Sequence, residues 1–395
     1  MGRATRRATS LRLRPARDTL REARHWASRV GISRVTEITA LDRIGCPVFA
    51  AIRPLASASP VSFGKGLRPI DAEVGAIMEA IETCYAEPGA RAVETTWGNA
   101  MAVAGAEHRE DAILDYAPIL NTQVDLQAPM LLVEAHEVES GQSALIPAEL
   151  VFHPAPMVGA KLFGTSTNGL ASGNSILEAT IHGLLELIER DIWSFEYVQN
   201  RSSLVRVDSL PASAQMLKER IARADLEFVV RHVPNPYGLA FFAVFLFDPE
   251  RLEPVFFNGG WGCHSMRNVA LNRALCEAAQ SRLAFIHGLR SLNSAESGAD
   301  NDKARVIKSI RLATSSSICC NYDAVPTFPP APTLQGQLNQ ILDQLRRVTR
   351  MPVYRVIYTN PSDRLQVVRI VVPTLEHFCP GTMRVGRRLG ASLNG

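Results

Sequence analysis

The sequence predicts an α+β fold, and two observations support this. Its β-rich and helical segments alternate without the regular strand–helix–strand rhythm of a doubly wound sheet. Its composition is that of an ordinary globular chain: of 395 residues, 46% are hydrophobic and 21% are charged. This balance excludes a disordered, collagen-like or small disulfide-stapled chain. No run of about 18 uncharged apolar residues occurs, so we expect no membrane span.

Helices are predicted from apolar periodicity and from the residues at their ends. The expected helices cover about residues 70–86, 176–195, 268–288 and 338–349. The first stops at Pro88-Gly89, which cannot continue a helix. The second begins at Ser172-Gly-Asn-Ser175, where a serine can cap the first turn.

Strands are predicted where β-branched and aromatic residues run together. The expected strand cores are residues 48–52, 131–133, 150–152, 228–233, 240–247, 353–358 and 365–372. Glycines indicate a loop at residues 62–66 and a turn at 258–262. Residues 291–334 are polar and then proline-rich, which predicts a long surface loop.

Charge divides the chain into a basic arm, residues 1–30, and a body, residues 31–395. The arm has nine arginines and two acids, a net charge of +7, which leaves −4 for the body. A body of this charge is not expected to bind nucleic acid. For the arm three interpretations stay open: a solvated leader, a contact for an acidic partner or peptide, and a targeting peptide. It lacks the apolar run of a secretory signal.

Seven cysteines are present, and none are spaced as Cys-x-x-Cys. An odd number without this spacing argues against a zinc site and against a secreted disulfide framework. We therefore expect a cytoplasmic protein.

Glutamates gather on the polar faces of three expected helices. On the second helix, at about 100° per residue, Glu178, Glu186 and Glu189 share an arc with His182 and Arg190. Apolar residues fill the opposite arc. A solvated helix face usually mixes charges of both signs, so this clustering is unusual.

The other two helices repeat the pattern, with Glu79 and Glu82 on the first and Glu277 and Gln280 on the third. If the helices converge, the carboxylates cannot all stay ionised without cations. Oxygen ligands favour Mg²⁺, which is commonly shared with substrate phosphates. The alternative, three amphipathic helices with solvated glutamates, stays open. The chain contains no Walker loop and no Gly-x-Gly-x-x-Gly after a strand.

Four motifs occur in order along the chain. They are Ser62-Phe-Gly-Lys-Gly66, Met78-Glu-Ala-Ile-Glu82, Ser172-Gly-Asn-Ser-x-x-Glu-Ala-x-x-His-Gly-x-x-Glu-x-x-Glu-Arg-Asp191 and Arg273-Ala-Leu-x-Glu-Ala-x-Gln-Ser-Arg282. Together they resemble the YcaO family, over about residues 42–373. The resemblance implies an α+β YcaO-type fold with mixed or antiparallel sheets, in which carboxylate-bearing helices surround a Mg-ATP site. We expect core motifs at 62–288 and a C-terminal α/β part at 335–395.

The resemblance also implies site residues. The expected metal ligands are Glu79, Glu82, Glu186, Glu189 and Glu277. The expected ATP-binding residues are Asn174, Glu178, Arg190 and Gln280, to which charge and position add Lys65 and Arg282. The sequence assigns no catalytic base.

Members of this family use ATP to phosphorylate a backbone amide oxygen of a peptide or protein. A neighbouring Cys, Ser or Thr then gives an azoline, and a sulfide donor gives a thioamide. Residues 371–376, Val-Val-Pro-Thr-Leu-Glu, resemble stand-alone members that work with a TfuA-like protein, and no Pro-x-Pro-x-Pro tail follows. We therefore expect thioamide formation, with azoline formation or a non-catalytic ATP-binding accessory role as alternatives. The expected partners are a precursor peptide or protein and a TfuA-like or leader-binding protein; a homodimer is also considered.

Four further residues have two interpretations each. His264 can be structural or close to substrate, and His182 can orient a carboxylate or pack in the core. Cys263 and Cys379 can carry persulfide sulfur or remain buried free thiols.

Overall fold

The computed structural model describes residues 5–6, 11–89, 93–105, 109, 111–286, 299–315 and 318–393. The helices are α1 (Ala16–Ala27), α2 (Pro69–Ala86), α3 (Ile176–Gln199), α4 (Ala212–Arg223), α5 (Arg267–Ile286), α6 (Ala299–Thr314), α7 (Leu334–Leu345) and α8 (Arg387–Leu393).

The strands are short and most pair antiparallel. They are β1 (Thr5–Arg6), β2 (Leu11–Arg12), β3 (Arg34–Glu37), β4 (Val48–Ile52), β5 (Val61–Lys65), β6 (Thr95–Gly98), β7 (Met130–Glu137), β8 (Ser143–Pro147), β9 (Leu170–Gly173), β10 (Ser203–Val205), β11 (Glu227–His232), β12 (Ala240–Phe247), β13 (Phe257–His264), β14 (Cys319–Cys320), β15 (Tyr354–Ile357) and β16 (Gln366–Val371). The pairing of β10 with β14 is parallel. The predicted α+β class with mixed and antiparallel sheets is confirmed.

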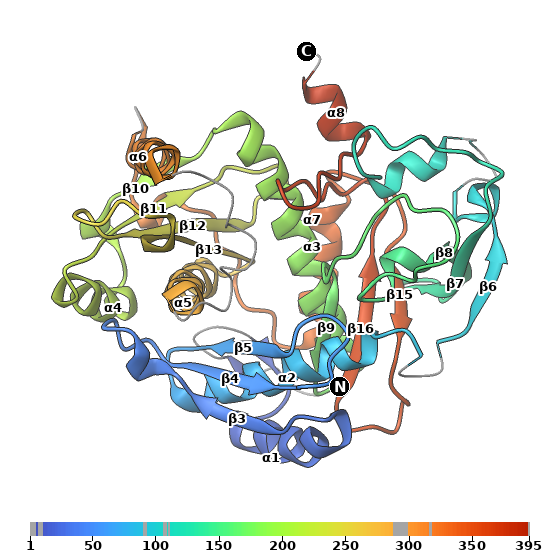
Figure 1. Ribbon diagram of the computed structural model, residues 1–395, viewed down its shortest axis with the longest axis horizontal. Coiled ribbons are helices and arrows are strands. Elements are labelled where there is room, and N and C mark those ends of the chain that lie inside the picture. Colours follow the sequence, from blue (N-terminus) through green and yellow to red (C-terminus); the bar gives the residue numbers. More distant parts are fainter. Residues whose placement is uncertain are drawn as a thin grey trace.

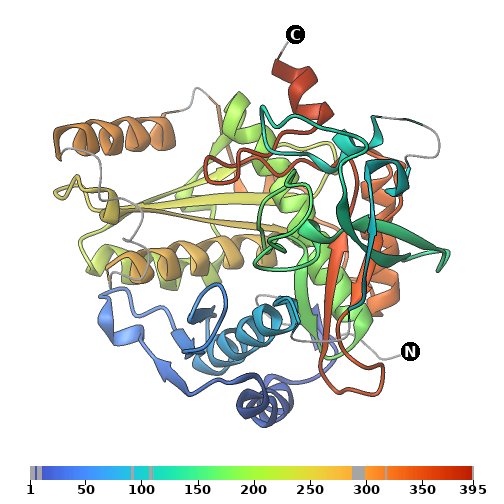
Figure 2. The ribbon, with the colours of Figure 1, turned by 45° about the vertical axis from the view of Figure 1, so that its right-hand side comes forward.

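The central helix α3 lies between two sheets, and a third sheet lies below them (Figure 1). A five-stranded sheet (β13-β12-β11-β10-β14) lies on one side of α3, and a six-stranded sheet (β6-β7-β15-β16-β9, with β8 beside β7) lies on the other (Figure 1). The third sheet, β3-β4-β5, packs on α2 below them. Helices α5 and α6 lie on opposite faces of the five-stranded sheet (Figure 2). Helices α2, α3 and α5, which carry the glutamates, therefore lie where the sheets meet.

Two glycine-rich segments that the sequence predicts as a loop and a turn are strands. Residues 62–66 fall largely in β5, and 258–262 fall within β13. A Cβ on Gly64 would lie 1.9 Å from the carbonyl oxygen of Ala72 in α2. A Cβ on Gly262 would lie 2.1 Å from the carbonyl oxygen of Ala270 in α5. These glycines allow a strand and a helix to pack backbone to backbone. In a sequence, a glycine needed for such close packing looks the same as a glycine needed for a turn.

Other boundaries also differ from the prediction. Residues 150–152, an expected strand core, form no strand, and the 3₁₀ helix Ala148–Leu150 overlaps their start. Helix α6 occupies much of the expected loop 291–334, of which 291–298 and 316–317 lie outside the described residues. Helix α7 begins earlier than predicted because the side chain of Thr333 caps it by accepting the N–H of Gly336.

The basic N-terminal segment is folded over residues 11–30, where a solvated arm was one expectation. Helix α1 packs on α2 and buries Leu20, Ala23 and Trp26. The ring of Trp26 stacks on Tyr85, with centroids 5.6 Å apart. The segment therefore contributes to the core, although the division of the chain at residue 30 stays a prediction.

The glycine-punctuated C-terminal tail is likewise anchored. The buried carboxylate of Glu376 accepts the backbone N–H groups of Gly386 and Leu389, at 2.6 and 2.9 Å. Arg388 donates to the buried carboxylate of Asp191 in α3, at 2.7 Å. The last contact leaves no sign in the sequence, because Arg388 and Asp191 lie 197 residues apart along the chain.

Candidate functional site

A cavity of about 550 Å³ lies where α2, α3, α5, β5 and the N-terminal segment meet. This volume is within the range of small-molecule sites. The predicted site residues that line it are Lys65, Glu79, Glu82, Asn174, Glu178, Glu186, Glu189, Arg190, Glu277 and Gln280. The structure thus brings together ten of the eleven predicted residues from distant parts of the chain.

Arg282 is the exception, because it does not line this cavity. Its guanidinium is buried outside the cavity, where Nε donates to the carboxylate of Asp42 at 3.2 Å. The cavity is instead lined by Arg273. The two arginines are nine residues apart on α5, about 180° around a helix, so they point to opposite faces. The spacing was available in the sequence, since Arg273 precedes Glu277 by four residues and Gln280 by seven.

Helix α3 presents its carboxylates to the cavity because its other face is needed for the core. Leu184 and Ile188 are fully buried on that other face. The helix starts at the predicted cap, where the side chain of Ser175 accepts the N–H of Glu178 at 3.2 Å. The predicted polar arc of this helix is therefore the cavity wall.

The carboxylates are close enough to change one another's ionisation. Burial raises the pKa of Glu82 to about 8; hydrogen bonds from Ser172 oppose this shift, and the carboxylates of Glu79 and Glu186 add to it. Burial also raises the pKa of Glu186 to about 7, against the opposing charge of Arg190. A cation bound here would favour the ionised forms.

Glu189 and Glu277 form a second carboxylate neighbourhood. Burial raises the pKa of Glu189, and the charge of Glu277 adds to this, although Glu189 also accepts the N–H of Cys263 at 2.8 Å. Burial acts on Glu277 too. Its pKa is nevertheless lowered, because the ammonium of Lys65 lies 2.6 Å away.

Three residues of the N-terminal segment, Arg12, Ala16 and Thr19, also line the cavity, and the sequence analysis missed them. Arg12 Nη1 donates to the buried carboxylate of Glu178 at 3.1 Å, and the N–H of Leu13 donates to it at 2.7 Å. Thr19 donates to the side-chain oxygen of Asn174 at 2.9 Å. The alternation of leucine with arginine at residues 11–14 was the available sign of a strand. Nine arginines in thirty residues made a solvated segment the simpler interpretation.

Several buried polar atoms of the cavity wall have no hydrogen-bond partner among the described residues. They are Arg190 Nε, Arg273 Nε and Trp261 Nε1. An unsatisfied buried donor is costly, by about 1–3 kcal/mol. Cationic and N–H donors of this kind fit an anionic, oxygen-rich ligand such as a nucleoside triphosphate.

The carboxylates fit Mg²⁺ held jointly with phosphate. In the described part of the chain, no three His, Cys, Asp or Glu side chains are arranged as a complete metal site. Mg²⁺ usually takes one or two protein carboxylates and completes its shell with water and substrate phosphates. Neighbouring pairs such as Glu82 with Glu186 supply ligands of this kind.

The structure gives the surroundings of the four residues for which the sequence left two interpretations. His264 is structural: its Nδ1 accepts the N–H of Met266 at 3.0 Å, and burial lowers its pKa to about 3. His182 lines the cavity beside the carboxylates. Cys263 is buried, and burial raises the pKa of its thiol. Cys379 is half-buried, 3.3 Å from the hydroxyl of Thr382.

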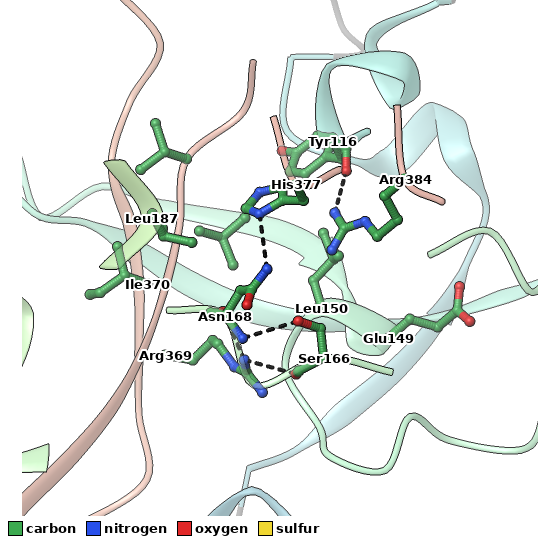
Figure 3. A pocket seen from close by; sticks show the side chains of 12 residues that line it. Tyr116, Glu149, Leu150, Ser166, Asn168, Leu187, Arg369, Ile370, His377 and Arg384 are labelled. Atoms are coloured by element: carbon green, nitrogen blue, oxygen red, sulfur yellow. Dashed lines mark hydrogen bonds between the residues drawn. The ribbon is translucent and has the colours of Figure 1, made fainter. Parts of the chain in front are cut away.

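A second, much smaller cavity of about 20 Å³ is lined by Arg369, His377 and Arg384, with Leu187 from α3 (Figure 3). It has room for about one water molecule. Arg369 donates to the carbonyl oxygens of Val151 and Ser166, and Arg384 donates to those of Tyr116 and Ala117. Their guanidinium groups therefore join separate backbone segments, as Figure 3 shows for Ser166 and Tyr116.

No helix in the described part of the chain has the length and apolarity to cross a membrane.

The comparisons with known proteins identify the family. Residues 63–376 match the family model described as YcaO cyclodehydratase, ATP- and Mg²⁺-binding. An uncharacterised protein of Methanothermobacter thermautotrophicus is 33% identical over 96% of this chain and 99% of its own length. An uncharacterised protein in the tfuA 3′ region of Rhizobium leguminosarum bv. trifolii is 29% identical over 92% of this chain and 89% of its own length.

Solved structures agree in fold. The YcaO protein of Methanopyrus kandleri bound with AMPPCP and Mg²⁺ superposes with a TM-score of 0.79, at 23% identity, over 98% of both chains. A heterocyclase in complex with substrate and cofactor superposes with a TM-score of 0.77, at 16% identity, over 97% of this chain and 55% of that one. The ligands predicted from the carboxylates, ATP and Mg²⁺, are those of the matched family. This chain belongs to the YcaO family of ATP-dependent enzymes.

Proposed function

We propose that this protein uses ATP to phosphorylate backbone amide oxygens of a peptide or protein, and that it forms thioamides. One observation carries the proposal: carboxylates, a lysine and arginines converge in a single cavity of about 550 Å³. An amide oxygen is a poor leaving group, and phosphorylation allows it to leave as phosphate. Bound ATP supplies the phosphoryl group, and positioning and charge neutralisation are the main tasks of the protein in such transfers.

Each group of residues has a distinct task. Glu79, Glu82, Glu186, Glu189 and Glu277 are the proposed metal ligands. Lys65, Arg190 and Arg273 neutralise phosphate oxygens, and the half-buried surroundings strengthen these contacts relative to water. Asn174 and Glu178 are held by Arg12, Leu13 and Thr19, so the N-terminal segment shapes the same site.

Thioamide formation is favoured by the relative from a tfuA 3′ region and by the resemblance of residues 371–376 to stand-alone members. A TfuA-like protein is the proposed partner. Azoline formation is the second candidate, because the family description is that of a cyclodehydratase and a heterocyclase shares the fold. An accessory role without chemistry is the candidate of a different class.

The proposal is tested by supplying ATP, Mg²⁺, sulfide and a candidate precursor peptide, with and without a TfuA-like protein. Peptide-dependent phosphate release separates an enzyme from an accessory protein. Thioamide formation raises the peptide mass by about 16 Da, and azoline formation lowers it by about 18 Da. Glu186→Gln is the inactive variant. Glu73→Gln is the matched control, because Glu73 lies on α2 outside the cavity and pairs with Arg24.

A further inference from the structure

The cavity-lining face of α3 changes character toward the C-terminal end of the helix. Glu186 and Arg190 line the cavity, and Trp193 and Tyr197 follow at helical spacings of three and four residues. Residues so spaced share one face of a helix. The carboxylate face therefore continues as an aromatic face that leads away from the cavity.

Four rings form a continuous aromatic path along this face. The path consists of Trp261 on β13, Trp193 and Tyr197 on α3, and Phe378 in the C-terminal segment. Ring centroids are 4.9 Å apart for Trp261 and Trp193, 6.3 Å for Trp193 and Tyr197, and 5.6 Å for Tyr197 and Phe378. The aromatic path reaches the surface at Tyr197, which is 50% exposed.

Trp261 belongs to both the cavity and the aromatic path. It lines the cavity, and its indole nitrogen is buried without a hydrogen-bond partner among the described residues. A buried tryptophan N–H normally has a partner. Gly259, two residues earlier on the same face of β13, leaves room for the ring, since a Cβ there would lie 3.2 Å from the indole. The strand therefore holds an aromatic donor at the cavity wall, and no group in the described part of the chain accepts its N–H.

The position of the aromatic path along α3 indicates that its ligand is the molecule that receives the phosphoryl group and not the nucleotide. Asn174 and Glu178 lie at the N-terminal end of the helix, whereas the cation Arg190 lies about 18 Å further along, at 1.5 Å per residue from Glu178. The aromatic residues begin beyond Arg190. A group that receives phosphate must approach from beyond the phosphate-binding cations, and a polypeptide segment needs an open route to the surface.

We propose that the aromatic path binds the peptide segment that contains the amide to be modified, with the indole N–H of Trp261 donating to a backbone carbonyl of that segment. The substrate class is an extended segment with apolar side chains beside the modified amide. Tryptophan and tyrosine supply large contact areas with a polar handle, which suits this task. Phe378 adds the C-terminal segment to the same surface, where its N–H donates to Ser194 of α3 at 2.9 Å. This inference rests on the proposed function.

The test measures peptide and nucleotide binding on the same full-length protein. Protein saturated with Mg-AMPPNP is titrated calorimetrically with the peptide acetyl-Gly-Leu-Gly-Phe-Gly-amide, and with acetyl-Gly-Ser-Gly-Asn-Gly-amide for comparison. The wild-type protein should bind the apolar peptide about tenfold more tightly than the polar one. Trp261→Phe keeps the ring and removes the N–H, and Tyr197→Ser removes an exposed ring. Each should weaken binding of the apolar peptide about tenfold and leave Mg-AMPPNP affinity within about twofold.

Trp97→Phe is the matched control, because Trp97 is an exposed tryptophan on β6 in another sheet, and it should bind both ligands as the wild type does. Wild-type protein with no preference for the apolar peptide would overturn the inference, as would folded variants that bind it normally. Loss of Mg-AMPPNP affinity in Trp261→Phe would also overturn it, since the indole N–H would then serve the nucleotide and not the peptide. Failure of the wild type to bind Mg-AMPPNP would instead refute the proposed function.

Discussion

Replacing Glu186 by glutamine should stabilise the ligand-free protein and weaken nucleotide binding. The carboxylate of Glu186 makes no hydrogen bond with the described residues, and its pKa is about 7 in the folded protein, against about 4.3 in an unfolded chain. Below about pH 4 the carboxyl group is protonated in both the folded and the unfolded state, so its ionisation does not change the free energy of unfolding. As the pH rises, the unfolded chain ionises first, so the folded state loses stability up to about pH 7.

The magnitude follows from the difference between the two pKa values. It corresponds to about 1–3 kcal/mol near pH 7.5, after allowance for partial contact with solvent. Glutamine has no charge to bury, so Glu186→Gln should unfold about 1–4 °C higher than wild type at pH 7.5 in EDTA, with little difference at pH 4.5. Removing one charge from the metal cluster should cost about 2–4 kcal/mol of Mg-nucleotide binding, a loss of about 30- to 1,000-fold.

Differential scanning calorimetry at the two pH values and titration with Mg-AMPPNP measure these effects. Glu73→Gln, whose carboxylate pairs with Arg24 outside the cavity, should leave nucleotide affinity unchanged. Unchanged nucleotide affinity in Glu186→Gln would refute the reasoning. So would a variant that is less stable than wild type at pH 7.5, because burial of the carboxylate would then not be the dominant cost.

The folded N-terminal segment, the glycine contacts and the C-terminal anchor each give a further prediction. Deleting residues 1–30 should lower the free energy of unfolding by about 5 kcal/mol or more, because several large apolar side chains lose their burial; urea unfolding that matches full length would contradict this. Gly262→Ala should cost about 3 kcal/mol or more, because the new Cβ would meet the backbone of α5, whereas Gly381→Ala, with nothing within 4 Å of its Cβ, should be neutral in the same assay. Ending the chain after Pro380 should lower peptide turnover about tenfold and leave nucleotide affinity within about twofold. It should also lower the melting temperature, since Leu389 is fully buried. Full turnover in the shortened protein would argue against a substrate-side role for the tail.

The helices that carry the site were predictable because their apolar periodicity, their capping residues and their polar faces all indicate the same helix. The polar arc of α3, its serine cap and its apolar opposite face all indicate one helix in one orientation. The same periodicity places Glu277 and Gln280 on one face of α5. The family motifs then implied which carboxylates meet, and ten of eleven predicted residues line one cavity.

Contacts between distant segments could not be predicted, since they leave no periodic trace. Gly64 and Gly262 resemble turn residues in the sequence, and only the helix backbones packed against them explain why glycine is needed inside a strand. Arg282 has the charge expected of a phosphate ligand, but Asp42, from far along the chain, binds it outside the cavity.

The sequence by itself determined the class of fold, the carboxylate faces of three helices and the kind of ligand that such faces suit. Only the tertiary structure decided that the basic segment at residues 11–30 is part of the cavity wall, where Arg12 meets Glu178, and that Trp261 joins Tyr197 and Phe378 in one aromatic path. The physical reason is that the periodicity of apolar residues shows which face of a helix or strand is buried. It does not show which other element packs on that face, because that element can come from a distant part of the chain.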